Sequence, residues 1–428
     1  MRSYNKMYGL FAAMMKWQLL PAMVLGLMAA SPAFAQYTLT TLASFNGANG
    51  GLPLAGLTLS GNTLYGTTLE GGANGDGEVF SLPVTGGTPT VLASFNSANG
   101  NSPQADLTLS GNTLYGTTSG DAVNNDGTVF SLPVTGGTPT VLASFNGANG
   151  EVPVAGLTLS GNTLYGTTNG GGANNRGTVF SLPVTGGTPT VLASLNGTNG
   201  EYPSADLTLS GNTLYGTAVS GGANNFYGVV FSLPVTGGTP TVLASFNGAS
   251  GQDPQAGLTL SGNTLYGTTS GGGANNLGEV FSLPVTGGTP TVLASFNGTN
   301  GGEPEAGLTL SGNTLYGTTA LGDANGDGNV FSLPVTGGTP TVLASFSGTN
   351  GNEPFADLTL SGNTLYGTTF EGGDLSLMND FGGLGEGTVF ALTVPEPASA
   401  SLLLIAGAGM LMRRRRNNQH KPQLQENQ

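Results

Sequence analysis

The sequence predicts an all-β protein, a seven-bladed β-propeller with four antiparallel strands in each blade. The first reason is a repeat: the motif Leu57–Thr68 (LTLSGNTLYGTT) returns seven times almost letter for letter. The interval is 50 residues, except for 51 between the fourth and fifth copies. Repeats of this length built from short strands are typical of propeller blades. The tyrosines of the motif are Tyr65, Tyr115, Tyr165, Tyr215, Tyr266, Tyr316 and Tyr366.

The second reason is the pattern inside one unit. Four short β-type runs are expected at Gly56–Ser60, Thr63–Thr68, Glu78–Leu82 and Thr90–Phe95, because each is rich in Val, Leu, Phe, Tyr and Thr and ends at turn residues. A Ser-Gly-Asn hairpin joins the first two runs. A Pro-Val-Thr-Gly-Gly-Thr-Pro connection joins the last two, and its prolines should keep it out of the sheet. No 3.6-residue period indicates a helix in the repeats.

The third reason is the register of the two ends. Tyr37–Phe45 copies a fourth strand that has no blade of its own, whereas the last unit stops after its third strand at Val389–Leu392. The leading strand should therefore complete the last blade. Both faces of the strands carry apolar residues, with Val91, Ala93 and Phe95 on one face and Leu92 on the other, which suits sheets packed between neighbours in a ring. An open β-solenoid is the competing arrangement, but its coils are usually shorter and need capped ends.

Residues 1–35 are predicted to be a secretory signal peptide. A basic start precedes the apolar core Leu19–Ala30, and Ala33 and Ala35 fit the small-residue rule for cleavage before Gln36. An uncleaved anchor is the alternative.

The body, residues 36–394, is acidic and poor in chemically reactive side chains. Its only Lys or Arg is Arg176, and it has no His, Cys or Trp. Between Gln36 and Met412 stand 22 acidic residues against that single arginine, a balance of −21. Such a surface should not bind nucleic acid or an anionic membrane, and divalent cations or cationic surfaces fit it better. The absence of cysteine fits an exported protein that is stabilised by ring closure.

Residues 395–416 are predicted to be a sorting segment with one hydrophobic transmembrane helix, and residues 417–428 a disordered tail. The apolar run Ala398–Met412 would span ~22 Å as a helix, less than the ~30 Å hydrocarbon core, unless arginines snorkel or the bilayer thins. The arginines should stay cytoplasmic, which leaves the body outside. The sorting residues are Pro395, Glu396, Pro397, Arg413, Arg414, Arg415 and Arg416.

This tail resembles the PEP-CTERM sorting signal, which has a Pro-Glu-Pro motif, a hydrophobic helix and a basic cluster in that order. The resemblance implies processing by an exosortase, a membrane protease, and delivery from an inner-membrane-anchored precursor to the cell surface or extracellular matrix. A plain membrane anchor is the alternative. Residues 37–392 are similar to GloVer tandem repeats, which implies a surface protein and brings no known catalytic residues.

The residue inventory excludes most catalytic chemistry. Without His, Cys or Lys in the body, Ser-His-Asp, Cys-His and Schiff-base mechanisms cannot be assembled, and zinc lacks its usual ligands. Glycine runs such as Gly271–Gly273 lack the lysine of a phosphate loop. A carboxylate-only glycosidase is conceivable, but no acidic pair recurs at a fixed spacing. We therefore expect no enzyme, no catalytic residue and no cofactor other than calcium.

Calcium is the one metal that the sequence leaves open. Asp323, Asn325, Asp327 and Asn329 place oxygen atoms at alternate positions, as at the start of an EF-hand loop. The twelfth position is Pro334 instead of glutamate, so the full motif fails. Ordinary Asp-Gly turns are the alternative.

The seven units differ mainly in two connections, the one between the second and third strands and the one leading from a fourth strand to the next first strand. In an up-and-down blade both should lie at one end of the ring. Loops on a rigid scaffold often carry binding groups, although neutral drift would also diversify them. The candidate ligand face comprises Arg176, Tyr202, Phe226, Tyr227, Phe355 and Phe381.

The sequence therefore predicts an exported, non-catalytic propeller at the cell surface or in the extracellular matrix. Its expected partners are the exosortase and an extracellular polysaccharide or another envelope component. Two alternatives stay open: a purely structural surface protein without a ligand, and a carboxylate-dependent enzyme that acts on glycans.

Overall fold

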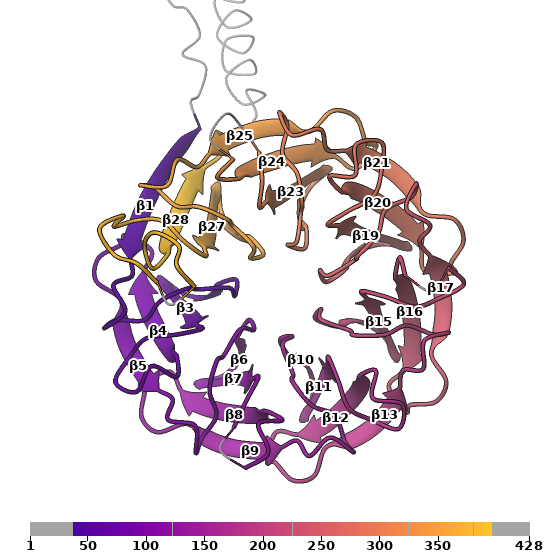
Figure 1. The fold of residues 1–428 in the computed structure, drawn as a ribbon, viewed down its shortest axis with the longest axis horizontal. Helices are drawn as coiled ribbons and strands as arrows, with labels where there is room; N and C mark the ends of the chain where they lie inside the picture. The colour runs from indigo at the N-terminus through magenta and orange to yellow at the C-terminus, as the bar shows by residue number, and fades with distance from the viewer. Residues whose placement is uncertain (1–36, 122, 225, 323–325, 380, 396–428) are drawn as a thin grey trace, which may run out of the picture. The chain divides into compact units, whose positions relative to one another are not determined.

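The computed structural model describes residues 37–121, 123–224, 226–322, 326–379 and 381–395, and they form a closed ring of β-sheets (Figure 1). Tyr37–Val394 is one compact unit. The predicted signal peptide, the tail 417–428 and the sorting segment apart from Pro395 lie outside the described residues. Within the described ranges, no helix has the length and apolar character to cross a bilayer.

The ring consists of seven four-stranded antiparallel sheets, as the repeat predicts. The innermost strands are β2 (Thr58–Ser60), β6 (Thr108–Ser110), β10 (Thr158–Ser160), β14 (Thr208–Ser210), β18 (Thr259–Ser261), β22 (Thr309–Ser311) and β26 (Thr359–Ser361). The second strands are β3 (Thr63–Thr68), β7 (Thr113–Thr118), β11 (Thr163–Thr168), β15 (Thr213–Ala218), β19 (Thr264–Thr269), β23 (Thr314–Thr319) and β27 (Thr364–Thr369). The third strands are β4 (Glu78–Pro83), β8 (Thr128–Pro133), β12 (Thr178–Pro183), β16 (Val229–Pro234), β20 (Glu279–Pro284), β24 (Asn329–Pro334) and β28 (Thr388–Thr393). The outer strands are β1 (Thr38–Ser44), β5 (Thr90–Ser94), β9 (Thr140–Ser144), β13 (Thr190–Ser194), β17 (Thr241–Ser245), β21 (Thr291–Ser295) and β25 (Thr341–Ser345).

The two ends of the body close the ring, which confirms the prediction from the strand register. One sheet has the order β1-β28-β27-β26. Its seam pairs Thr38 with Thr393 at one end and Ser44 with Thr388 at the other. Figure 1 shows indigo β1 beside yellow β28. The last blade is thus assembled from both ends of the body.

Two local expectations were wrong. Pro83 pairs with Thr63 at the end of β4, so the proline lies in the ladder. It is tolerated there because it is the last strand residue, and its carbonyl accepts the Gly86 N–H at 2.8 Å. In β5, Val91 is 38% exposed and does not share the buried face of Ala93. A bulge causes this difference, since Ala93 pairs with Val79 but Val91 already pairs with Phe80.

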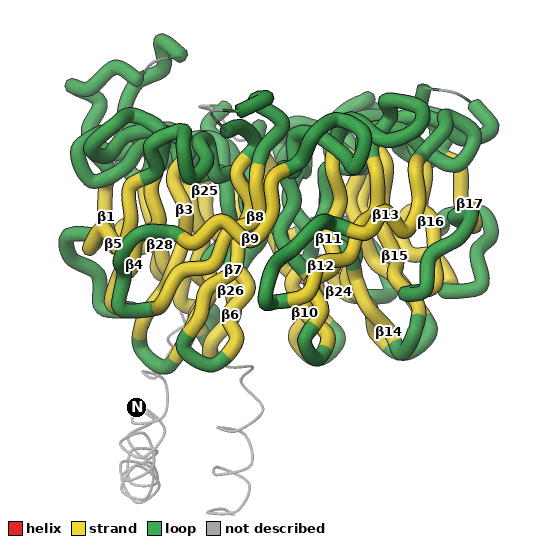
Figure 2. Tube along the Cα trace, turned by 90° about the horizontal axis from the view of Figure 1, so that it is seen from below, coloured by secondary structure: helices red, strands yellow, loops and turns green. Residues whose placement is uncertain are grey.

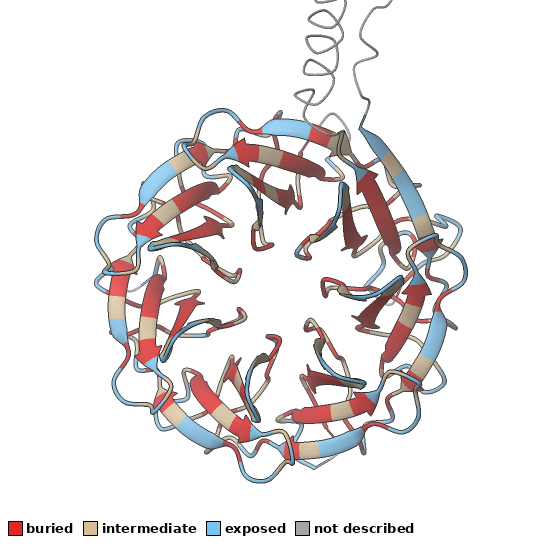
Figure 3. Cartoon of the chain, turned by 180° about the vertical axis from the view of Figure 1, so that it is seen from behind, coloured by how far each residue is buried: buried red, intermediate tan, exposed pale blue. Residues whose placement is uncertain are grey.

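The hydrophobic core lies between neighbouring blades, which confirms the expectation of two-sided packing (Figure 3). Phe45 of the last blade meets Phe80 of the first, with ring centroids 5.1 Å apart. Phe95 of the first blade meets Phe130 of the second in the same way. A Cβ on Gly66 would lie 2.7 Å from Cζ of Phe80, which explains why each Leu-Tyr-Gly-Thr motif has a glycine. The recurring tyrosines pack between blades, and Tyr65 is buried.

Threonine hydroxyls add two closed rings of hydrogen bonds between blades. The first threonine of each inner strand donates to a leucine carbonyl of the following blade, from Thr58 to Leu107, and the circle ends with Thr359 donating to Leu57. A second ring runs from the threonine after the motif glycine, Thr67 in the first unit, to an alanine carbonyl of the following blade and closes where Thr368 donates to Ala55 at 2.8 Å. Since each such bond contributes about 1 kcal/mol, the motif threonines stabilise closure.

Candidate functional site

The two variable connections lie at the same end of the ring, as predicted. The N–H of Gly51 donates to the Glu70 carbonyl at 3.0 Å, and the N–H of Glu70 donates back at 3.2 Å, so the two loops of one blade are paired. The N–H of Leu52 donates to the carbonyl of Glu386 in the preceding blade at 2.8 Å. Figure 2 shows the larger loops at one end of the ring and short hairpin turns at the other. We call the end formed by these two sets of connections the variable face.

One residue in each connection from a fourth strand to the next first strand has an unfavourable backbone conformation. The residue before the proline has φ between +51° and +57° in all seven units, and none of these residues is glycine. The chain has 75 glycines and uses many of them at positive φ elsewhere. Left-handed non-glycine residues are strained and tend to gather at functional sites. These residues are Leu52, Ser102, Val152, Tyr202, Asp253, Glu303 and Glu353.

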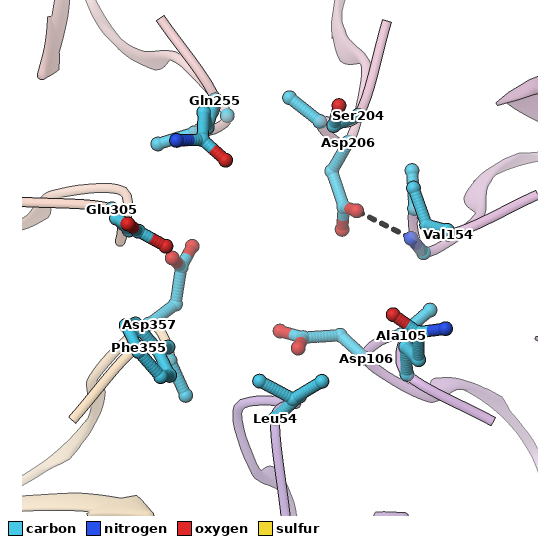
Figure 4. A pocket seen from close by; sticks show the side chains of 17 residues that line it. Leu54, Ala105, Asp106, Val154, Ser204, Asp206, Gln255, Glu305, Phe355 and Asp357 are labelled. Carbon is cyan, nitrogen blue, oxygen red and sulfur yellow. Dashed lines mark hydrogen bonds between the residues drawn. The ribbon is translucent and has the colours of Figure 1, made fainter. Parts of the chain in front are cut away.

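A pocket of about 110 Å³ opens where the seven connections converge. It is lined by the residue after each proline, by the following alanines, and by Gly or Asp. The variable lining residues are Leu54, Gln104, Val154, Ser204, Gln255, Glu305 and Phe355. Figure 4 shows carboxyl groups of Asp106, Asp206, Glu305 and Asp357 directed into this space. The pocket therefore differs chemically around its circumference although the blades are nearly identical.

The aspartates of the pocket pair with glycines of the preceding unit. Oδ1 of Asp357 accepts the Gly307 N–H at 2.5 Å, and Oδ1 of Asp206 accepts the Gly156 N–H at 2.5 Å, the bond dashed in Figure 4. Asp106 accepts the Gly56 N–H at 2.6 Å. From one unit to the next, this position alternates between Gly and Asp. Because the number of units is odd, the alternation must break once around the ring. It breaks at Gly257, because the next unit also has a glycine at this position.

This pairing predicts opposite outcomes for the same substitution in two units. In Gly307→Ala the new Cβ would lie 2.7 Å from Oδ2 of Asp357, so the carboxyl group must move and lose its hydrogen bond. We expect a loss of about 1–2 kcal/mol in the free energy of unfolding, measured by urea denaturation. In the matched variant Gly257→Ala the nearest atom is 3.6 Å away, and we expect no loss or a gain of about 0.5 kcal/mol. Equal losses in both variants would contradict the pairing.

The pocket is electrostatically negative, and its carboxyl groups hold protons more tightly than usual. Desolvation by the surrounding blades, with repulsion from Asp357, raises the pKa of Asp206 to about 6. Desolvation, with repulsion from Glu303 and Glu353, raises the pKa of Glu305 to about 7. The pKa values of Asp106 and Asp357 are also raised, mainly by desolvation.

The structure divides the six predicted face residues into separate groups. Arg176 forms an ion pair with Glu201. Tyr202 and Phe226 are 41% and 76% exposed. Tyr227 instead packs half-buried against the cluster that contains Phe246, so a large part of its ring supports the fold.

Arg176 and Tyr202 are neighbours, because the N–H of Tyr202 donates to the Arg176 carbonyl at 3.0 Å. Phe355 and Phe381 belong to a second continuous surface. They are joined by Phe370, whose ring centroid lies 5.6 Å from Phe355 and 6.2 Å from Phe381. Phe370 was not among the predicted face residues, because it follows β27 directly and begins the long loop of the last unit. The differing residue at this position in the other units was the available signal.

The residues of the predicted calcium loop are only partly described. Asp323 and Asn325 lie outside the described residues. Asn329 is fully buried at the start of β24, and its side-chain amide has no hydrogen-bond partner among the described residues. Within the same ranges, no group of three or more His, Cys, Asp or Glu side chains could hold a metal ion. Calcium binding at this loop stays a prediction.

The comparisons with known proteins agree with the fold. The sequence profile of the Gloeobacter/Verrucomicrobia repeat matches residues 31–226 and 220–408. No curated protein matches the sequence. A europium-containing methanol dehydrogenase is similar in structure, with 11% identity, 83% of this chain and 93% of that chain covered, and a TM-score of 0.50.

Two further solved structures show weaker likeness. A quinohemoprotein alcohol dehydrogenase from Comamonas testosteroni has 12% identity, with 82% and 69% of the two chains covered and a TM-score of 0.46. A gluconolactonase from Xanthomonas campestris has 15% identity, with 66% and 82% covered and a TM-score of 0.39. At such identities the likeness concerns the fold alone.

Proposed function

The chain belongs to the family of the Gloeobacter/Verrucomicrobia repeat, and we propose that it is an exported, non-catalytic propeller that binds an extracellular polysaccharide or another envelope component. The proposed export rests on the predicted signal peptide, residues 1–35. The proposed delivery to the cell surface or matrix rests on the sorting segment, residues 395–416, and its resemblance to exosortase substrates.

The observation that carries the binding proposal is the confinement of variation to one end of a nearly uniform ring. The opposite end repeats its turns almost unchanged, whereas the variable face carries different side chains in each unit around a pocket. Neutral drift does not explain why non-glycine residues occupy the positions of positive φ before the prolines, where glycine would adopt the same backbone conformation without strain. Side chains held at strained positions on a rigid scaffold are typical of binding surfaces.

A second candidate function draws support from one pocket residue. Glu305, whose pKa is raised to about 7, could serve as a proton donor, and Asp357 lines the same pocket. Paired carboxyl groups of this kind hydrolyse glycosidic bonds in many enzymes. Against this candidate, Asp357 already accepts the N–H of Gly307, which fixes it on the pocket wall. Reducing-sugar release from the extracellular polysaccharide that is abolished in Glu305→Gln would favour the enzyme over the binding protein.

Replacement of exposed rings on the variable face should abolish binding. We expect Tyr202→Ser, Phe226→Ser and Phe381→Ser together to reduce retention of the exported protein on its native extracellular polysaccharide at least tenfold. All three rings are more than a third exposed, so the fold should survive. Tyr227 is left intact because it packs in the core. The measurement is a pull-down with the purified polysaccharide.

The matched control removes apolar surface from the rim of the ring instead. Val91, Val191 and Val292 lie on outer strands and are 36–39% exposed, and their replacement by threonine should leave retention unchanged. Equal retention of the triple-serine variant and the wild type would count against the variable face as the binding surface.

A further inference from the structure

Three aromatic rings form a row on the variable face of the last unit. Phe355 lines the pocket, Phe370 follows β27 and Phe381 lies in the loop before β28. Adjacent ring centroids are 5.6 and 6.2 Å apart, and exposure rises to 66% at Phe381. The other ring pairs in the described part of the chain are the buried ones between blades. This row, which we call the aromatic row, therefore leads from the pocket to the surface.

Carboxyl groups surround the inner end of the aromatic row. Glu305 and Asp357 line the pocket beside Phe355 (Figure 4). Glu303 and Glu353 lie close enough to raise the pKa of Glu305 by repulsion. The body offers no countercharge, because its single arginine, Arg176, is paired with Glu201. A ligand that enters here meets aromatic faces and uncompensated negative charge together.

We propose that the aromatic row and the pocket bind a polysaccharide whose sugars carry free amino groups. The inference rests on the proposed function and names the ligand class. Phenylalanine rings offer flat apolar faces to sugar rings and attract ammonium groups to their π-systems. Ionised Glu305, Glu353 and Asp357 can accept charge-assisted hydrogen bonds from ammonium groups. Polymers of uronic acids would be repelled by the same carboxylates.

A protein partner fits the site less well. Leu375, Met378 and Leu384 are exposed in the same loop as Phe381 and would suit an apolar protein surface. They do not explain why the row continues into a pocket of about 110 Å³. They also do not explain the carboxyl groups at its inner end. Variants of these aliphatic residues separate the two kinds of partner.

The test is calorimetric titration of the exported protein with three β1,4-linked hexamers: glucosamine, N-acetylglucosamine and a uronic acid. We expect the glucosamine hexamer to bind at least tenfold more tightly than the acetylated one and the uronic acid hexamer not to bind. Phe355→Leu with Phe381→Ser should weaken glucosamine binding at least tenfold. Glu305→Gln with Glu353→Gln should weaken glucosamine binding and leave the acetylated hexamer unaffected.

Two variants serve as matched controls. Asp374→Asn removes an exposed carboxylate of the same loop and should not change binding. Met378→Ser with Leu384→Ser removes apolar surface without touching the row. A loss of binding in the latter variant equal to that of the phenylalanine variant would overturn the proposal. The near-isosteric glutamine variant keeps the test valid if the phenylalanine variant unfolds.

The outcomes separate this inference from the proposed function. If the protein is retained on its native polysaccharide but binds all three hexamers equally, or binds none of them, the proposed ligand class is overturned and the proposed function stands. Absence of binding to the hexamers and to the native polysaccharide would overturn both. If the preference for the glucosamine hexamer persists in both the phenylalanine variant and the glutamine variant, the ligand does not bind at the aromatic row and the pocket.

Discussion

Removal of β1 should abolish cooperative folding of the propeller. Without residues 37–46, which contain β1 (Thr38–Ser44), one edge of β28 loses its ladder partner, although β28 is a central strand of the last blade. Ala43 and the adjoining Phe45 are both buried. Burial of a large side chain such as that of Phe45 contributes on the order of 1.5–3 kcal/mol to stability. Six paired residues of the ladder add roughly 1 kcal/mol for each hydrogen bond. The sum approaches the 5–15 kcal/mol that typically stabilises a whole domain.

Thermal unfolding followed by circular dichroism would measure this effect. We expect the wild type to melt in one sharp transition and the truncated protein to show none, with rapid cleavage by protease. A synthetic peptide of residues 37–46 added in excess should restore the transition, and a scrambled peptide of the same composition should not. A truncated protein that melts cooperatively near the wild-type temperature would show that closure through β1 is dispensable.

The closure at β1 was predictable because it depends on counting. Each unit repeats its strands in a fixed order, with one surplus strand at the start of the body and one missing strand at its end. Within a ring, the surplus strand can complete only the blade that lacks a strand. Turn residues marked most strand ends to within one residue: Thr63–Thr68 is observed without any shift, whereas the run predicted at Gly56–Ser60 forms a strand only over Thr58–Ser60. Local chemistry and topology agree at these positions, which makes the sequence informative.

The features that the sequence analysis missed depend on contacts between units. The bulge in β5 arises from pairing with β4, and alternation alone cannot reveal it. Proline disfavours conformations other than extended ones in the residue before it, yet the loop pairing of Gly51 with Glu70 holds Leu52 at φ +56°.

The pocket was also hidden for a physical reason. An aspartate such as Asp357 gains its role only through Gly307, fifty residues earlier and in the neighbouring blade. A signal did exist, because each Ala-Asp pair in the sequence follows a unit that has Ala-Gly at the same position. Reading that complementarity requires knowing that consecutive units are in contact at the centre of the ring.

The same pocket makes stability depend on pH in a direction unusual for an acidic protein. We expect the protein to be more resistant to urea at pH 5 than at pH 8. The pKa values of Asp206 and Glu305 are raised to about 6 and about 7 from ordinary values of 3.8 and 4.5. Between those limits the folded state keeps protons that the unfolded chain releases, so the free energy of unfolding falls as pH rises. This contribution is complete below about pH 4 and lost above about pH 7.

The size of the effect follows from the two shifts together. Each pKa unit corresponds to about 1.4 kcal/mol, and because both carboxyl groups are only half-buried, solvent screening reduces the total to about 2–4 kcal/mol. Asp206→Asn with Glu305→Gln should make the slope of the profile between pH 5 and pH 8 shallower; the raised pKa values of Asp106 and Asp357 leave a residual slope. The asparagine can still accept the N–H of Gly156, so packing should survive.

The control for this prediction is Asp374→Asn. Hydrogen bonds from Ser376 lower the pKa of Asp374, so any contribution of that residue is lost only as pH falls below its ordinary value of 3.8. Its removal should therefore leave the slope between pH 5 and pH 8 unchanged. A wild-type profile that rises with pH would mean that the pocket carboxyl groups are stabilised in their charged form. Arg176, the only cationic side chain in the body, does not provide that stabilisation, because it is already paired with Glu201.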